Sequence, residues 1–251
     1  MFADTPGWLQ TLGWLACRYH LLVLGSTAVR FAFPLLVAVM ASTLVSCGGS
    51  DHATAVPVPL DQRFVTVEDA PGSQTDPIET RQTTENFDEF IAVLTDAMID
   101  PNSDEMTRVF QDAGFKAAGL DARFFGATHS PETSPHVFSS FIEVESEDAA
   151  KRALEFLETD LKKPCPESCA TKISDFDVGD IGGARGVHRV ATVEDIEAVG
   201  ATEQRPRDSY WVGFTDGALV YTLDLQGPPG SVTEEQARKI ASAYYQRLTD
   251  S

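Results

Sequence analysis

The sequence predicts an α+β domain in which an antiparallel sheet of about four to five strands carries amphipathic helices. Two observations lead to this class. Segments that alternate apolar and polar residues are followed by a segment with apolar residues at helical spacing, and this order occurs twice. The last two predicted strands are joined by Asp216-Gly217, a dipeptide typical of tight hairpins. The predicted architecture is a quasi-repeat of ββα units preceded by two helices, a repeat of pattern without residue identity.

The two leading helices are predicted from apolar stripes. The first covers residues 85–98, with Thr83 or Thr84 as its N-cap and with a stripe of Phe87, Phe90, Ile91, Leu94 and Met98. Asp100-Pro101-Asn102-Ser103 separates it from a second helix, whose stripe is Met106, Val109, Phe110 and Ala113. Gly114 is expected to end that helix in the left-handed conformation.

The first ββα unit has predicted strands at residues 120–126 and 136–144, joined by a loop at 129–135. Ser146 is expected to cap the following helix, whose stripe is Ala150, Leu154, Leu157 and Leu161. The outer face of this helix carries acid-first pairs four residues apart, Glu147–Lys151, Asp148–Arg152 and Glu158–Lys162.

The second unit has predicted strands at residues 186–193, 210–214 and 218–226, and Pro228-Pro229-Gly230 ends the last of them. Ser231 and Glu234 have the spacing of a capping box. They would open a final helix, striped by Ala237, Ile240, Ala241, Tyr244 and Leu248.

An export signal precedes the domain. Residues 31–45 form an apolar run after Arg30, and the run ends in Leu44-Val45-Ser46-Cys47. A basic residue, a short apolar run and small residues make a secretory signal. The run is shorter than the roughly 20 residues that a membrane span needs. The final four residues match the bacterial lipobox, which implies cleavage before Cys47 and diacylglycerol on its sulfur. The alternative is an ordinary apolar helix that happens to end in a cysteine.

The chain therefore divides into three predicted parts: a leader and signal peptide at residues 1–46, a lipidated Cys47 with a disordered tether at 47–84, and the α+β domain at 85–251. Residues 1–28 hold a second apolar stretch, and our hypothesis is that the true start lies near Val29. An uncleaved two-helix anchor is the alternative. Within the tether, which is rich in Gly, Pro, Ser and Thr, residues 63–67 alone could dock as an edge strand.

Charge limits the partners. The chain has 38 acidic and 19 basic residues, a net charge of −19. A phosphate backbone would repel such a domain, which excludes general nucleic-acid binding. An anionic membrane surface would repel it as well, so the lipid must supply the attachment. We expect a cell-membrane protein, lipid-anchored and facing outside the cytoplasm.

Two cysteines remain once Cys17 is removed with the leader and Cys47 is lipidated. Cys165 and Cys169 are predicted to form a structural disulfide, because exported thiols are usually oxidised. The alternative is copper handling or thiol exchange, since Cys165-Pro-Glu-Ser-Cys169 resembles the Cys-Pro-x-x-Cys loop of membrane-anchored copper-delivery proteins of the thioredoxin fold. Those loops lie between a strand and a helix, whereas this one follows a helix, and His188 lies on a predicted strand.

Two segments rich in oxygen-bearing side chains are weaker candidates for cation-binding sites. Asp100, Asn102 and Asp104 imitate the start of a calcium loop, but Glu105 and Gln111 stand where glycine and a bidentate glutamate belong, which favours a helix start. A second acidic group is expected to be a solvated edge: Asp175, Asp177 and Asp180. The glycine-rich residues 179–186 lack nucleotide-binding spacing and predict a tight turn or bulge.

No catalytic constellation is predicted, and no cofactor or metal is expected. The histidines of the mature chain are scattered, and none lies beside a serine in a nucleophile-elbow pattern: His52, His129, His136 and His188. His129 and His136 flank one loop and would offer two metal ligands at most. Most of the aromatic residues are expected in the core or on a sheet face: Tyr210, Trp211, Phe214, Tyr221, Tyr244 and Tyr245.

Three features lie near the end of the sequence: Tyr210-Trp211-Val212-Gly213-Phe214, the strand that ends near Leu223 and the helix at 237–248. Together they resemble the ending of a loose group of actinobacterial lipoproteins and extracytoplasmic sensor-type domains of unknown function. The resemblance covers about the last hundred residues. It implies no catalytic residue. We therefore expect a non-catalytic, lipid-anchored extracytoplasmic lipoprotein that binds a small ligand or an envelope protein partner. The alternative is a copper-handling or thiol-redox protein that uses Cys165 and Cys169.

Overall fold

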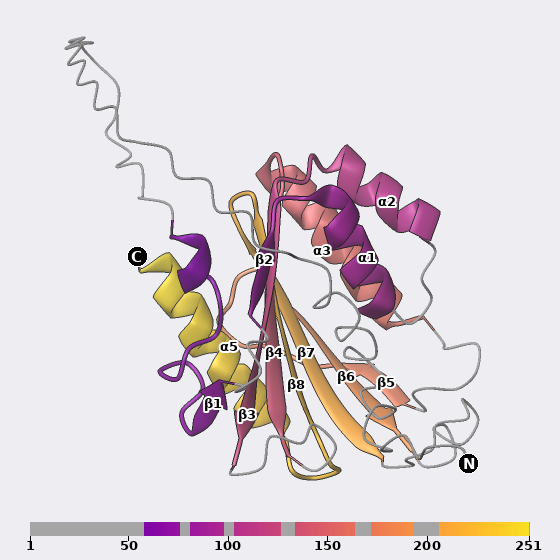
Figure 1. Ribbon diagram of the computed structural model, residues 1–251. Helices are drawn as coiled ribbons and strands as arrows, with labels where there is room; N and C mark the ends of the chain where they lie inside the picture. Colours follow the sequence, from indigo (N-terminus) through magenta and orange to yellow (C-terminus); the bar gives the residue numbers. More distant parts are fainter. Residues whose placement is uncertain are drawn as a thin grey trace, which may run out of the picture.

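The sheet is antiparallel throughout and has eight strands (Figure 1). The computed structural model describes residues 58–75, 81–97, 103–126, 134–163, 172–192 and 206–250. The strand order is β1-β3-β4-β8-β7-β6-β5, and β2 also pairs with β3. The predicted α+β class with an antiparallel sheet is confirmed, but the prediction of four to five strands was too low.

Three short strands account for most of the difference. These are β1 (Ser73–Thr75), β2 (Gln82–Thr84) and β5 (Lys172–Asp175), and their residues are mostly polar and exposed. A strand of three or four polar residues has no apolar alternation to reveal it. The other strands lie close to their predicted positions: β3 (Ala117–Phe125), β4 (His136–Glu143), β6 (Arg185–Ala191), β7 (Arg207–Asp216) and β8 (Leu219–Gly227).

Helices cover both faces of the sheet. On one face lie α1 (Phe87–Ala97), α2 (Ser103–Asp112) and α3 (Glu147–Leu161), and on the other lies α5 (Glu234–Thr249) (Figure 1). The hairpins β3-β4 and β7-β8 are joined by the pairing of β4 with β8. The helices that follow these hairpins, α3 and α5, pack on opposite faces of the sheet. None of the described helices combines the length and the apolar character that a membrane span requires.

Two apolar cores result, one on each face. Along β8, Tyr221, Leu223 and Leu225 belong to the core under α5, whereas Val220 belongs to the core under α3. The predicted helix stripes are largely buried, including Met106, Phe110, Leu154, Ala237 and Tyr244. The side chain of Leu94 and all of Met98 lie outside the described residues.

The helix ends confirm two predictions and correct two. Ser146 caps α3 by accepting a hydrogen bond from the Ala149 N–H (3.3 Å), and Gly114 is left-handed, with φ of 66°. The N-cap of α1 is Asn86, whose Oδ1 accepts from the Asp88 N–H (3.0 Å), because Thr83 and Thr84 belong to β2. The predicted caps there were wrong.

The capping box of α5 also differs from the prediction. It consists of Thr233 and Gln236 and lies two residues beyond Ser231 and Glu234. The Ser231 hydroxyl donates instead to the Pro228 carbonyl oxygen at 2.6 Å, which stabilises the turn that ends β8. The proline-rich turn is therefore longer than the sequence indicated, and the helix begins after it.

The segment predicted to be a tether is folded over residues 58–75. It includes the 3-10 helix Leu60–Gln62, and Phe64 and Val65 are fully buried in the core under α5. The Val65 N–H donates to Ser139 Oγ (3.2 Å), and residues 63–67 form no strand, so the edge-strand alternative was wrong. The folded domain thus includes residues well before the predicted boundary at 85, because two apolar side chains reach a core built by distant strands.

Candidate ligand-binding face

Four central strands place polar side chains in one line across the sheet. Arg189 of β6 is paired with Ser209 of β7, Ser209 with Gln226 of β8, and Gln226 with His136 of β4. Each lies an even number of residues from a member of the core under α3, so all four side chains face that side. We call Arg189, Ser209, Gln226 and His136 the polar row.

Asp224 adjoins the polar row on β8 and is buried. Its Oδ1 accepts a hydrogen bond from Ser209 Oγ at 2.7 Å, and its Oδ2 accepts one from Gln226 Nε2 at 2.6 Å. The two neutral donors hold the carboxylate in one orientation. The side chains of Ser209 and Gln226 are thereby fixed in orientation as well.

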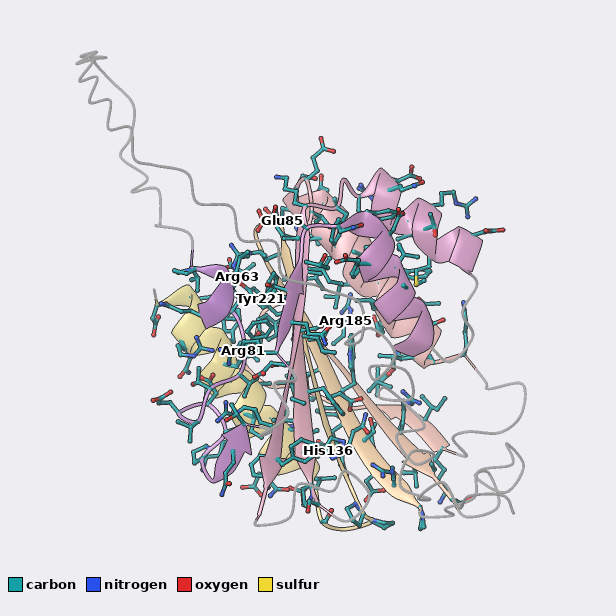
Figure 2. All side chains as sticks on the ribbon, viewed as in Figure 1. Arg63, Arg81, Glu85, His136, Arg185 and Tyr221 are labelled. Carbon is teal, nitrogen blue, oxygen red and sulfur yellow. The ribbon has the colours of Figure 1, made fainter. Side chains whose placement is uncertain are left out.

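His136 is almost completely buried at the far end of the row, low on β4 in Figure 2. Burial lowers its pKa to about 4, although hydrogen bonds to the Ser134 carbonyl and to Gln226 act in the opposite direction. Its ring packs between Phe124 and Phe138, with centroid distances of 5.6 and 4.9 Å. The imidazole is therefore neutral at pH 7.

Arg189 differs from the other members of the polar row. Its Nε atom is buried and has no hydrogen-bond partner, and no ion pair joins it to any carboxylate of the described residues. Burial lowers the pKa of this guanidinium, while the charges of Asp224 and Asp160 raise it. An arginine side chain stays charged in proteins, and this one is half-buried, so one buried donor of a charged group lacks a partner among the described residues.

The hydrogen bonds of the row differ from those of a hydrolytic relay. A hydrolytic relay needs the serine hydroxyl to donate to the histidine. Here the Ser209 hydroxyl donates to Asp224, and Gln226 separates that carboxylate from His136. The arrangement presents one cation and several fixed dipoles on a rigid sheet.

The structure describes some of the predicted site residues and leaves others outside the described ranges. Cys47, Cys165, Cys169, His52 and His129 lie outside the described residues, as do Asp100 and Asn102. His136 belongs to the polar row, whereas His188 faces the opposite side of the sheet. There its ring stacks on that of Tyr210, with a centroid distance of 4.2 Å and an interplanar angle of 2°.

The acidic and glycine-rich candidates have local structural roles. Asp175 pairs with Lys162 Nζ at 2.6 Å, and Asp177 Oδ1 accepts from the Gly179 N–H at 3.0 Å. Within the described ranges, no three histidine, cysteine or acidic side chains gather as metal ligands. Gly179 and Gly183 adopt φ of 86° and 74° in the turns before β6, which confirms the predicted turn. Trp211, Phe214, Tyr221 and Tyr244 are core residues, as expected.

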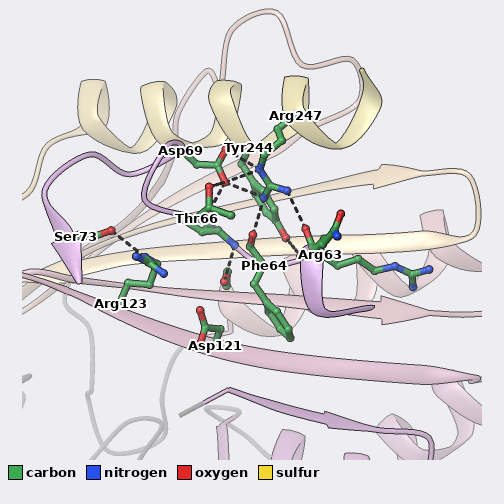
Figure 3. Close-up of polar contacts among 12 residues, drawn as sticks. Arg63, Phe64, Thr66, Asp69, Ser73, Asp121, Arg123, Tyr244 and Arg247 are labelled. Atoms are coloured by element: carbon green, nitrogen blue, oxygen red, sulfur yellow. Dashed lines mark hydrogen bonds and ion pairs between the residues drawn. The ribbon is translucent and has the colours of Figure 1, made fainter. Parts of the chain in front are cut away.

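A second polar cluster fastens the first described residues to the last helix (Figure 3). Arg247 Nη2 lies 2.8 Å from Asp69 Oδ2 and donates to the Phe64 carbonyl oxygen at 2.6 Å. The Thr66 N–H also donates to Asp69 Oδ2 (2.8 Å), and the Tyr244 hydroxyl donates to the Arg63 carbonyl oxygen. We call Thr66, Asp69, Tyr244 and Arg247 the N-terminal clamp.

Two further contacts show at which end of β4 the first described residues lie. Arg63 Nη1 lies 2.6 Å from Glu143 Oε2 at the last residue of β4, whereas His136 is the first residue of that strand. At the end near His136, Arg123 Nε donates to Ser73 Oγ (2.9 Å). The chain therefore enters at one end of β4, and the polar row lies at the other (Figure 2).

Sequence reasoning missed the members of the polar row other than His136. One signal was present, because Thr222, Asp224 and Gln226 alternate with apolar residues along β8. Alternation of this kind usually indicates a face in contact with water. The burial of Asp224 and Gln226 is a property of the assembled sheet and could not be read from that pattern.

No protein-family model and no curated protein matches the sequence. Among solved structures, the chain is similar to the extracellular domain of PknH from Mycobacterium tuberculosis, with 12% identity and a TM-score of 0.39 over 71% of this chain and 82% of that one. It is also similar to LpqN, which is involved in cell envelope biogenesis of Mycobacterium tuberculosis, with 11% identity and a TM-score of 0.25 over 50% of this chain and 66% of that one. At these TM-scores neither similarity carries an argument about this chain.

Proposed function

We propose that this chain is a lipid-anchored extracytoplasmic lipoprotein whose domain binds a small ligand or an envelope protein partner without catalysis. Cys47 carries the lipid, and the polar row is the binding surface. The observation that supports binding best is the row itself, four polar side chains on neighbouring strands beside a carboxylate held by two hydrogen bonds. Fixed polar groups on a rigid sheet are what specific binding requires.

The place where the chain enters the domain supports a polar row that lies away from the membrane. Val58, the first described residue, follows Cys47 by eleven positions. Eleven residues span at most roughly 40 Å, so the domain stays within that distance of its anchor. Because Arg63 pairs with Glu143, the Glu143 end of β4 is the end where the chain enters from the anchor. We infer that the polar row lies at the end of the sheet away from the anchor, within reach of envelope components.

Anchoring is tested with Cys47→Ser in an exporting bacterial host. We expect the wild-type chain in the membrane fraction, with the added mass of diacylglycerol at its first residue. The Cys47→Ser variant should lose both the lipid mass and the cleavage. Cys17→Ser is the matched control and should behave like the wild type. A wild-type chain without lipid, or one recovered from the cytoplasm, would overturn the anchoring part of the proposal.

Binding is tested by native mass spectrometry of the mature chain, purified from its membrane in detergent without chelator. A retained organic mass or a co-purified envelope protein supports the proposal. A copper adduct that disappears in Cys165→Ser would replace it with the copper-handling alternative. Turnover of a retained molecule would show that the chain is an enzyme.

A further inference from the structure

We propose that Arg189 forms an anion site at one end of the polar row and that its ligand bears a carboxylate group. This inference rests on the proposed binding function and names the chemistry of the ligand. It starts from the half-buried side chain of Arg189, whose buried Nε–H the described residues leave without a hydrogen bond.

Among the described residues, no carboxylate forms an ion pair with Arg189, although two act on its charge. The charges of Asp224 and Asp160 reach Arg189, but neither carboxylate lies within 4.0 Å of it. Asp224 is already held by Ser209 and Gln226, at 2.7 and 2.6 Å. Asp160 lies in the last turn of α3, where Lys163 Nζ approaches its Oδ1 at 3.3 Å. Turning Asp224 toward Arg189 would break two short hydrogen bonds.

A buried N–H donor without a hydrogen-bond partner is unfavourable, and structural arginines usually avoid it. A position that keeps one is consistent with a partner that arrives from outside. The fork of guanidinium N–H donors matches the two oxygens of a carboxylate or phosphate, which it can bind through parallel hydrogen bonds.

The surrounding charge favours a carboxylate over a phosphate. Asp224 and Asp160 already act on this position, and the whole chain carries a net charge of −19. A phosphate dianion would meet this repulsion with twice the charge of a carboxylate, against one guanidinium. Arg207, two residues before Ser209 on β7, adds positive potential that is felt at His136. A singly charged, planar anion fits this balance.

The test is an NMR titration of the full chain, labelled with 15N and purified in detergent, in which the arginine Nε–H signals are followed. The probes are propionate, propan-1-ol as its neutral analogue, and inorganic phosphate. Arg189→Lys identifies the signal of Arg189 by its loss. We expect propionate to shift that signal, and Arg189→Gln to weaken propionate binding at least tenfold, measured from ligand signals.

Arg185→Gln is the matched control. Arg185 lies on the same strand and the same face, but it is exposed and its Nε lies 3.2 Å from Glu158 Oε2. Propionate affinity should stay within twofold of wild type in this variant. A melting temperature for Arg189→Gln equal to or above that of wild type is also expected, because a buried donor without a partner is removed. A clear fall in melting temperature would identify Arg189 as a structural residue and overturn the inference.

The other outcomes separate the inference from the proposed function. Phosphate binding that exceeds propionate binding and needs Arg189 would overturn the carboxylate assignment. Equal binding of propan-1-ol would overturn the role of charge. If no probe binds while native mass spectrometry still shows a retained partner, the anion site is wrong and the binding function stands. If neither experiment shows a ligand, both are wrong.

Discussion

Asp69 and Arg247 form an ion pair across 178 residues of sequence, and it ties the segment that precedes β1 to the last turns of α5. Arg247 Nε lies 3.0 Å from each carboxylate oxygen of Asp69, and the same guanidinium donates to the carbonyl oxygens of Gln62 and Phe64. Asp69 is buried, so the pair fastens the first described residues of the domain to its last helix.

Arg247→Met is expected to lower the free energy of unfolding by about 3 kcal/mol, because it leaves the buried Asp69 carboxylate without its partner. Urea denaturation measures this change. Arg238→Met on the same helix is the control: Arg238 pairs with Glu234, both side chains are 43% exposed, and the loss should stay below about 1 kcal/mol. Equal losses in the two variants would contradict the role of the clamp.

Phe64→Ala is expected to lower the free energy of unfolding by about 3–5 kcal/mol, because the ring is fully buried against Phe141 at a centroid distance of 5.4 Å. Val67→Ala, three residues on and 48% exposed, should change it by no more than about 0.5 kcal/mol. Thermal or urea unfolding compares the two. A small effect of Phe64→Ala would mean that the domain folds without its first residues.

Acid should destabilise the protein through His136. The unfolded chain takes up a proton on this residue near pH 6.5, whereas the folded chain does so only near pH 4. Between these values protons favour the unfolded state. The contribution of His136 is fully present above pH 6.5 and is lost progressively as the pH falls to 4, by about 3 kcal/mol in all.

His136→Gln isolates this effect. Urea denaturation at steps between pH 4 and pH 7.5 should give a steep loss of stability for the wild type and a shallower one for the variant. The two curves should differ most in slope between pH 4 and pH 6.5. Parallel curves over that range would show that other groups control the acid sensitivity.

Cys165 and Cys169 are predicted to be joined in the exported chain. The intact mass should be lower by two hydrogens than that of the dithiol, and an alkylating agent should add no mass until a strong reductant is present. The double serine variant should lose less than the ~3 kcal/mol typical of a 15-residue loop, since the closed loop is much shorter. Thiols that react without reduction would favour the redox alternative.

The sequence by itself determined the elements that depend on local order. Helix stripes such as Ala237, Ile240 and Tyr244 need only the 3.6-residue period, and the hairpin at Asp216-Gly217 needs only a residue that tolerates positive φ, here 53° at Gly217. The fold class follows from these local signals in chain order. The lipobox at Cys47 is equally local, and it remains a prediction.

Tertiary structure decided everything that depends on contact between distant segments. Strand β1 exists because β3 offers it backbone hydrogen-bonding groups, and its own side chains carry no signal. Phe64 is core because Phe141 and α5 surround it, and the polar row exists because the register aligns Arg189, Ser209, Gln226 and His136. Pairing register and burial are properties of the assembled sheet, whereas periodicity is a property of one strand or helix alone.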